Sequence, residues 1–309
     1  MEPNNHTRVT EFIMQGLFDN LHHQELFFGL FLCLYTAIPM GNSLIIVAIV
    51  FHPSLHTPMY FITNLDMVNV MCSSSVLPKM IKNLMQERKS ISFDVCMVQL
   101  FAFTLSGGTE LVLLTVMSYD RYIAICHPLC CVNLMTKRIC ISLIIGVWAF
   151  IAINSLVHTL LIVRLDFCGP NFIQHFFCEI PPMLALSCSS IYFNKIMISI
   201  ANLFLAMGNF LLTTVSYGFI ITTILKIQSS KRKQRAFSTC FSHLLLVILF
   251  YSSIIYTYIR PPSSYSLDKD KMVAIMYTLE IPTLNPLIYS LRNKEVKVAF
   301  RKILSFMIK

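Results

Sequence analysis

The chain has 309 residues, of which 56% are hydrophobic and only 13% are charged. Soluble domains carry about 25% charged residues, so this composition excludes an ordinary soluble globular protein and indicates an integral membrane protein. The formal net charge is +9. Its basic residues gather beside long apolar runs, which favours membrane lipid and a cytoplasmic protein as partners and argues against nucleic acid.

Seven apolar runs follow one another along the chain, each near the roughly 20 residues that a helix needs to cross a bilayer. The predicted spans are 26–50, 58–82, 97–125, 140–163, 196–226, 237–259 and 271–290. They predict an all-α membrane protein, a seven-transmembrane helix bundle. Residues 1–25 are polar and show no cleavable signal, so we expect an outer tail followed by a first span that serves as the insertion signal.

The charge distribution predicts the orientation of the spans. With the N-terminus outside, the inner segments carry 14 basic and two acidic residues, whereas the outer segments carry ten of each. Basic residues concentrate on the cytoplasmic side of membrane proteins, so this asymmetry predicts an extracellular N-terminus and a cytoplasmic C-terminus. Asp66, Glu110 and Glu280 remain as acidic residues within the spans.

Two features of the predicted outer segments fit this orientation. Asn5-His6-Thr7 is an N-glycosylation acceptor triplet in the outer tail. Four cysteines also fall outside, where an oxidising environment permits disulfides, and their three connectivities cannot be distinguished by spacing. These cysteines are Cys96, Cys168, Cys178 and Cys188.

Charged and proline-containing motifs close the third and seventh spans. Asp120-Arg121-Tyr122 ends the third, where Arg121 can reach the inner membrane surface and pair with Asp120. In Asn285-Pro286, the proline removes a backbone hydrogen bond and the asparagine can satisfy a freed group, which predicts a hinge before Tyr289. A releasable ion pair together with a hinge is typical of a two-state transmembrane receptor.

These motifs resemble those of the olfactory receptors, a group of rhodopsin-type G-protein-coupled receptors, over nearly the whole chain. The matching segments are Gly41-Asn42, 56–61, 117–126, Ser216-Tyr217, 235–244 and 285–293. Asp-Arg-Tyr and Asn-Pro-x-x-Tyr are general to rhodopsin-type receptors. The Phe-Ser-Thr-Cys-x-Ser-His-Leu run at 237–244 and the three outer-loop cysteines are specific to olfactory receptors.

The resemblance implies disulfides Cys96–Cys178 and Cys168–Cys188. It implies a stimulatory olfactory G protein as the partner, which raises cyclic AMP. Coupling and switching are then expected of Asp120, Arg121, Tyr122, Tyr217, Asn285, Pro286 and Tyr289. Residues 291–309 resemble a short amphipathic helix and cytoplasmic tail along the inner membrane face. The expected location is the plasma membrane of olfactory sensory cilia.

Two departures from the family pattern fall in the second span. Pro58-Met59-Tyr60-Phe61-Ile62-Thr63 is one residue shorter than the usual segment, which turns the helix by about 100° on one side of the gap. Asn69 stands where the family usually has an Asp that contributes to a sodium and water pocket. Glu110 is retained there, so we expect a neutral carboxyl or a cation held without the second acid.

The resemblance also implies an odorant pocket between spans three, five and six. Its expected lining is Phe103, Thr104, Gly107, Gly108, Asn202, Leu205, Ala206, Tyr251, Ile254, Ile255 and Tyr258. Any one of these residues serves equally well in helix packing, and the two glycines in close helix contact. The lining has no fixed cationic anchor, which favours a small, neutral volatile.

Other classes of membrane protein fit less well. A transporter would show internal repeats and midplane charges, and a channel would show a polar pore stripe; neither pattern is visible. No enzyme motif, zinc-ligand spacing or cofactor motif occurs, so neither catalysis nor a cofactor is expected. A non-olfactory rhodopsin-type receptor is the nearest alternative, and the run at 237–244 argues against it.

Overall fold

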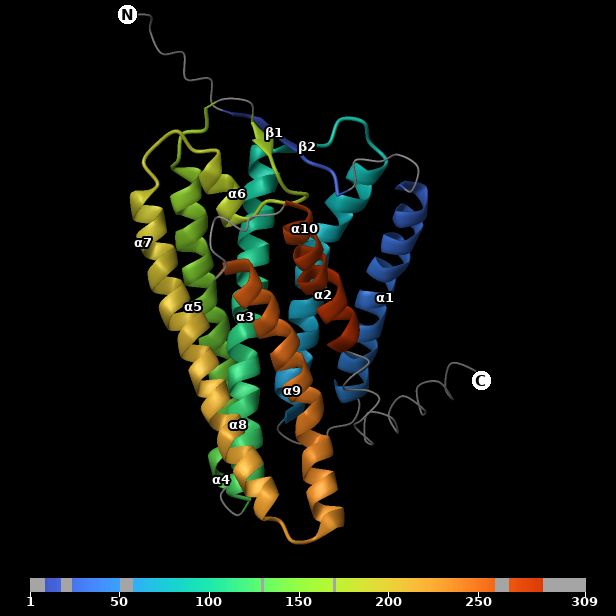
Figure 1. Cartoon of the computed structure of the whole chain (residues 1–309), viewed down its shortest axis with the longest axis vertical. Helices are drawn as coiled ribbons and strands as arrows, with labels where there is room; N and C mark the ends of the chain where they lie inside the picture. The colour runs from blue at the N-terminus through green and yellow to red at the C-terminus, as the bar shows by residue number, and fades with distance from the viewer. Residues whose placement is uncertain are drawn as a thin grey trace, which may run out of the picture.

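The computed structural model describes residues 9–17, 24–50, 58–128, 131–168, 171–258 and 267–285. Asn5, Pro286, Tyr289 and the expected C-terminal amphipathic helix lie outside these residues. Within them the chain is largely helical, and the long helices run side by side in Figure 1.

The long helices follow the predicted apolar runs and extend several of them. They are α1 (Gln24–Val50), α2 (Pro58–Leu84), α3 (Phe93–Cys126), α5 (Lys137–Val163) and α9 (Ser230–Tyr258). A further continuous helical segment runs through α7 (Tyr192–Ala201), the π-helix η2 (Asn202–Met207) and α8 (Gly208–Lys226). The last described segment joins α10 (Leu267–Ile275) to the π-helix η4 (Met276–Glu280) and continues as α-helix to residue 285. Short helices α4 (Cys131–Leu134) and α6 (Ile180–Ala185) lie in connections.

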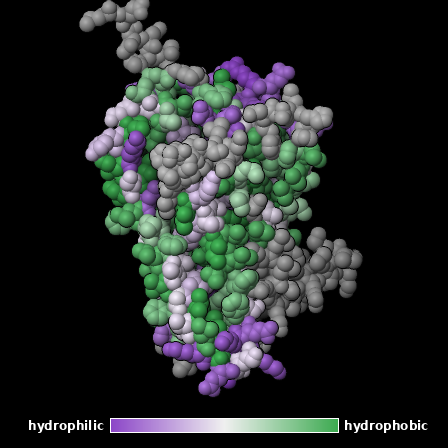
Figure 2. Space-filling view, in the orientation of Figure 1, coloured by the Kyte–Doolittle hydropathy of each residue, from purple (hydrophilic) through white to green (hydrophobic). Residues whose placement is uncertain are grey.

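Among the described residues, five helices are long and apolar enough to cross a membrane. They are Gln24–Val47, Phe93–Cys126, Lys137–Val163, Tyr192–Lys226 and Ser230–Tyr256. Many of their large apolar side chains are exposed, especially on α5 and α8. On the face shown in Figure 2, apolar residues cover the middle of the bundle and polar residues gather toward its two ends. An apolar outer surface of this kind suits contact with lipid chains.

α3 is the central helix of the bundle. It packs against α2, α5, α8 and α9, and Figure 1 shows it behind the α8 and α9 ribbons. Gly108 allows the contact with α5, because a Cβ atom there would lie 2.8 Å from Ile151 Cγ2. Small residues bring membrane helices close together in this way. A Cβ atom at Gly107 would have no neighbouring atom within 4 Å.

A small sheet covers one end of the bundle, here called the sheet end. Its strands are β1 (Glu11–Met14), β2 (Ser90–Ser92) and β3 (Phe172–Ile173), in the order β2-β1-β3. β1 pairs antiparallel with β2 and parallel with β3. Phe12 and Met14 point inward and are buried, while Ile13 between them is exposed. This alternation is the period of a strand with one face on a core.

Both disulfides implied by the resemblance lie at the sheet end. Cys96–Cys178 ties α3 to the loop after β3, with a Cα–Cα distance of 5.5 Å. Cys168–Cys188 closes the neighbouring loop, with a Cα–Cα distance of 5.7 Å. The sheet, the disulfides and the loop between them therefore form one cap that packs on the helices. The opposite end of the bundle carries Arg121 and is called the Arg121 end.

Candidate functional site: a switch at one end of the bundle and a covered pocket at the other

The Arg121 end holds the predicted ion pair near the end of α3. Arg121 Nε lies 3.8 Å from Asp120 Oδ2, and the two side chains are 18% and 6% exposed. At this distance the pair is an electrostatic contact rather than a short bidentate bond. Tyr122 makes separate contacts: its hydroxyl lies 3.1 Å from His127 Nε2, and its ring packs near Phe219 of α8. Arg121 is thus held loosely, within reach of helices that pack beside α3.

A buried hydrogen bond joins the neighbouring helices at this end. The Tyr217 hydroxyl of α8 lies 2.6 Å from His243 Nδ1 of α9, and the two rings are stacked with their centroids 5.9 Å apart. His243 also lies within electrostatic reach of Arg121. In the sequence, His243 was noted only as part of the family motif at 237–244, and no role was predicted for it. The sequence feature that could have indicated a role is an imidazole within a long apolar run.

A ladder of amides links three helical segments in the middle of the bundle. Asn285 Nδ2 donates to Asn69 Oδ1 at 3.0 Å, and Asn69 Nδ2 donates to Asn42 Oδ1 at 3.2 Å. Asn42 Nδ2 then donates to the Ile38 carbonyl at 2.8 Å and to the Pro282 carbonyl at 3.3 Å. The three asparagines are almost fully buried.

Glu110 of α3 lies beside this ladder, next to Asn285. Glu110 is 3% exposed, and Asn285 Oδ1 has no hydrogen-bond partner among the described residues. A carboxyl group and an amide oxygen without a donor are oxygen ligands of the kind that hard cations prefer. The described residues contain no cluster of three or more His, Cys, Asp or Glu side chains that could hold a metal ion. A cation here would therefore have to combine the Glu110 carboxyl with an amide oxygen such as Asn285 Oδ1.

Aromatic side chains pack together beneath the sheet, in a cluster here called the roof, which contains Phe103, Phe177 and Tyr277. The ring of Phe103, predicted to line the odorant pocket, lies 4.9 Å from Phe177 of the cap loop and 5.7 Å from Tyr277 of η4. The Tyr277 hydroxyl donates to Glu179 Oε2 at 3.4 Å. The roof thus joins the cap loop, α3 and the last described helical segment around Phe103.

Besides Glu179, the side chains of Lys271 and His175 are buried in the same part of the bundle. Lys271 of α10 is 3% exposed, and its Nζ donates to the Gly16 carbonyl at 2.8 Å. His175 is 6% exposed and stacks on Phe176, and its Nδ1 has no hydrogen-bond partner within the described ranges. Burial, and then the nearby Lys271 ammonium, lower the pKa of His175 to about 3. The sequence placed Lys271 at the edge of a span and gave it no role.

The remaining predicted pocket residues divide between different surroundings. Leu205, Tyr251 and Ile254 join one apolar cluster, while Phe103 belongs to another. The Thr104 hydroxyl bonds carbonyls of its own helix. Ala206 is half-buried, whereas Asn202 and Ile255 are exposed. The Tyr258 side chain is outside the described part of the chain. The described lining residues thus lie in two apolar clusters and at the outer surface of the bundle, and the odorant pocket stays a prediction.

Membrane-spanning helices, a disulfide from α3 to the cap loop and an Asp-Arg-Tyr pair at the opposite end of α3 define a rhodopsin-type G-protein-coupled receptor. The family model of the olfactory receptors matches residues 31–306. The chain belongs to the olfactory receptor family, whose fold is a seven-transmembrane helix bundle and whose members are receptors rather than enzymes.

Curated relatives agree over almost the whole length. Human olfactory receptor 13A1 is 51% identical over 98% of this chain and 92% of that protein. Human olfactory receptor 13G1 is 50% identical over 98% of this chain and 99% of that protein. Mouse olfactory receptor 5AR1 is 43% identical, with 98% of both chains covered.

Proposed function

We propose that this receptor binds a small, neutral volatile within the helix bundle and activates a stimulatory olfactory-type G protein, which raises cyclic AMP. Family membership supports the receptor role. The observation that carries the proposed signalling step is the Tyr217–His243 hydrogen bond between α8 and α9, beside Arg121. A bond between two helices next to a loosely held ion pair can form in one arrangement and break in another.

The charges at the sheet end support a neutral ligand. Lys271 already donates to the Gly16 carbonyl, and Glu179 accepts from Tyr277. A charged ligand would have to compete with these contacts in a buried roof, where an unpaired charge is costly. The ligand is then held mainly by apolar contacts below Phe103, with one hydrogen bond from a group such as Thr104. Activation by an acid at low micromolar concentration, without activation by its neutral analogues, would contradict this view.

The proposed orientation places the sheet end outside the cell and the Arg121 end in the cytoplasm, in the plasma membrane of olfactory cilia. Two disulfides at the sheet end suit an oxidising exterior. Glycosylation of Asn5 would report the same orientation. Treatment of surface-expressed receptor with an N-glycosidase should increase its gel mobility, and Asn5→Gln should remove that shift. A receptor with no glycosidase-sensitive shift would count against the assignment of Asn5.

The signalling proposal is tested by cyclic AMP measurement in cells that express the olfactory G protein. A panel of neutral and acidic volatiles is applied to the wild type, to Arg121→Ala and to the matched control Arg138→Ala. Arg138 is exposed at the start of α5, at the same end of the bundle. We expect Arg121→Ala to lose the response at equal surface expression and Arg138→Ala to keep it. A response that survives Arg121→Ala would remove the assigned role of this residue.

A sodium ion, if the receptor uses one, is proposed to lie between Glu110 and the unpartnered Asn285 Oδ1. Among the described residues, Glu110 supplies the carboxyl group at this site, because Asn69 is neutral and both the oxygen and the nitrogen of its amide are engaged in the ladder. Glu110→Gln should then abolish any sodium dependence of the melting temperature of the purified receptor. An unchanged sodium dependence in Glu110→Gln would refute this placement.

A further inference from the structure

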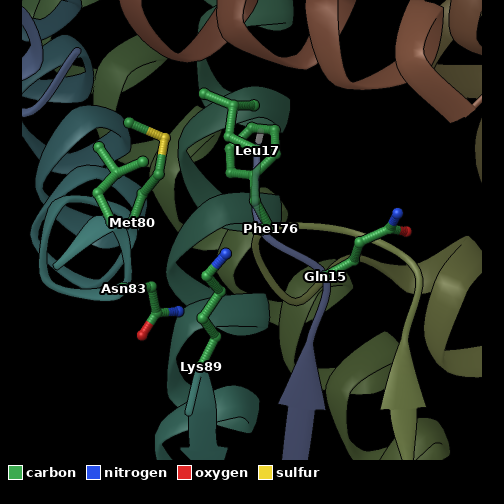
Figure 3. A pocket seen from close by; sticks show the side chains of 8 residues that line it. Gln15, Leu17, Met80, Asn83, Lys89 and Phe176 are labelled. Carbon is green, nitrogen blue, oxygen red and sulfur yellow. The ribbon is translucent and has the colours of Figure 1, made fainter. Parts of the chain in front are cut away.

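Two adjoining spaces lie at the sheet end, between the N-terminal strand and the tip of α2. The inner cavity measures about 10 Å³, enough for one water-sized group, and Figure 3 shows its walls. It is lined by Gln15, Gly16, Leu17, Met80, Asn83, Leu84, Lys89 and Phe176. The outer space is an open depression of about 480 Å³. Gln15, Gly16 and Lys89 line both, so the two spaces share one wall.

Two polar groups at the inner cavity, the Lys89 ammonium and the Asn83 amide oxygen, lack hydrogen-bond partners among the described residues. Figure 3 shows the Lys89 ammonium extended between Asn83 on one side and Gln15 on the other. Within the described chain, no hydrogen bond or ion pair engages this ammonium. Asn83 is 6% exposed and its Oδ1 has no partner, while its Nδ2 meets only the Met14 sulfur at 3.4 Å. An ammonium has three donors, more than one amide oxygen can use, and the described residues that line the inner cavity include no carboxylate.

Gly16 permits the inward position of Lys89. A Cβ atom at Gly16 would lie 2.1 Å from Lys89 Nζ, so any side chain there would displace the ammonium. The Gly16 carbonyl is in turn held by Lys271 Nζ at 2.8 Å. The segment that supports Lys89 is therefore fixed to α10.

The outer depression offers an apolar surface beside this cation. Ile13 and Phe172 are paired across β1 and β3, and they are 37% and 38% exposed. Arg88 lines the same depression and forms an ion pair with Glu11, while Glu87 adds a negative charge. Among the described residues, the lining thus combines the Lys89 ammonium, which has no ion-pair partner, with the exposed apolar side chains of Ile13 and Phe172. Its acidic residues disfavour a second negative charge on a ligand.

We propose that the sheet end binds a small monocarboxylate with a short hydrocarbon chain. One carboxylate oxygen enters the inner cavity and accepts from Lys89, because that cavity has room for a single oxygen. The hydrocarbon chain lies on Ile13 and Phe172 in the open depression. This site shares no residue with the pocket proposed for the neutral volatile, so it would add a second ligand class to the same receptor.

Protection of Lys89 from chemical acylation tests the proposal without a signalling readout. Purified full-length receptor in lipid nanodiscs is treated with an amine-acylating reagent, and modification of each lysine is followed by mass spectrometry. Hexanoate at ten times its midpoint should slow acylation of Lys89 about 10-fold. Lys82, exposed near the end of α2, is the internal reference. Hexan-1-ol should give no protection, and hexanedioate should protect less than hexanoate.

Two glycine variants provide a matched comparison. Gly16→Ala should abolish protection by hexanoate, because the added methyl group displaces the ammonium. Gly29→Ala should retain it, because a Cβ there meets no atom within 4 Å. As a second measurement, hexanoate should raise the melting temperature of the wild type and Gly29→Ala but not that of Lys89→Met. Equal protection by hexan-1-ol, absence of protection in the wild type, or full stabilisation of Lys89→Met would each overturn the proposal.

Discussion

Acidification should open the cap loop through His175. The imidazole is 6% exposed between aromatic rings, and its pKa is lowered to about 3 by burial and then by Lys271. In an open loop the same imidazole returns to a pKa near 6.5. The closed loop therefore has its full stability above the solvated pKa and loses it as the pH falls from there toward the lower value.

The magnitude follows from the interval between the two pKa values. At about pH 5 the open loop is protonated and the closed loop is not, so opening becomes easier by about 2 kcal/mol relative to about pH 7.5. This corresponds to an opening equilibrium about 30-fold larger. The Cys96–Cys178 disulfide still anchors one side of the loop. We therefore expect local opening rather than release of the cap.

Hydrogen exchange measured by mass spectrometry can detect this opening. Protection factors of amides in residues 172–178, corrected for the intrinsic pH dependence of exchange, should fall about 30-fold between about pH 7.5 and about pH 5. His175→Gln keeps a polar side chain without a proton equilibrium in this range, so its protection should stay constant. Peptides from the middle of α3 serve as an internal control. An equal pH response in the wild type and His175→Gln would refute the reasoning.

Three further predictions concern stability, each measured as a thermal midpoint of the purified receptor. Gly108→Ala should destabilise the receptor by about 1–3 kcal/mol, because the added methyl group clashes with α5. Gly107→Ala should stabilise the receptor by about 1 kcal/mol, because alanine has the higher helix propensity and has space there. Shifts of the same sign in the two variants would contradict this. Trp148→Phe removes the 3.0 Å indole bond to Asn64 and should cost about 1 kcal/mol; an unchanged midpoint would argue against that bond. The Asp66 carboxyl is fully buried and has no hydrogen-bond partner in the described part of the chain. Asp66→Ser replaces it by a hydroxyl that can bond its own helix, so this variant should raise the midpoint. A lower midpoint would show that the carboxyl is stabilising.

The sequence predicted the long helices well because apolar runs of span length have few other solutions in a membrane. It did not predict the sheet at the cap. β1 has only four residues within a polar tail, and its partners lie some 80 and 160 positions further along the chain. Pairing between such distant segments leaves little local signal. The sequence likewise did not predict the π-helix η2, because its residues have the same apolar composition as the helices on either side.

Site residues were predicted where the residue type itself carries the chemistry. The Asp120–Arg121 contact follows from two adjacent opposite charges at the end of an apolar run. The pairing of the four outer cysteines followed only from the resemblance to the olfactory receptors, because their spacing allows three connectivities. Lys271 and His243 were missed as functional residues for a different reason. Each gains its role from a partner in another segment, the Gly16 carbonyl for Lys271 and the Tyr217 hydroxyl for His243. A single sequence does not specify such partners.

Asn69 stands where the family usually has an aspartate, and this difference alters both the charge of the amide ladder and the direction of its hydrogen bonds. An aspartate at this position could still accept from Asn285, but it could not donate to Asn42 Oδ1 when ionised. With asparagine, donors and acceptors alternate from Asn285 through Asn69 to Asn42, and the chain ends on the Pro282 carbonyl. The ladder therefore binds α1 and α2 to the last described helical segment without any ion. Glu110 stands beside this neutral ladder, so we expect the link between the sheet end and the Arg121 end to depend on helix contacts more than on a bound cation.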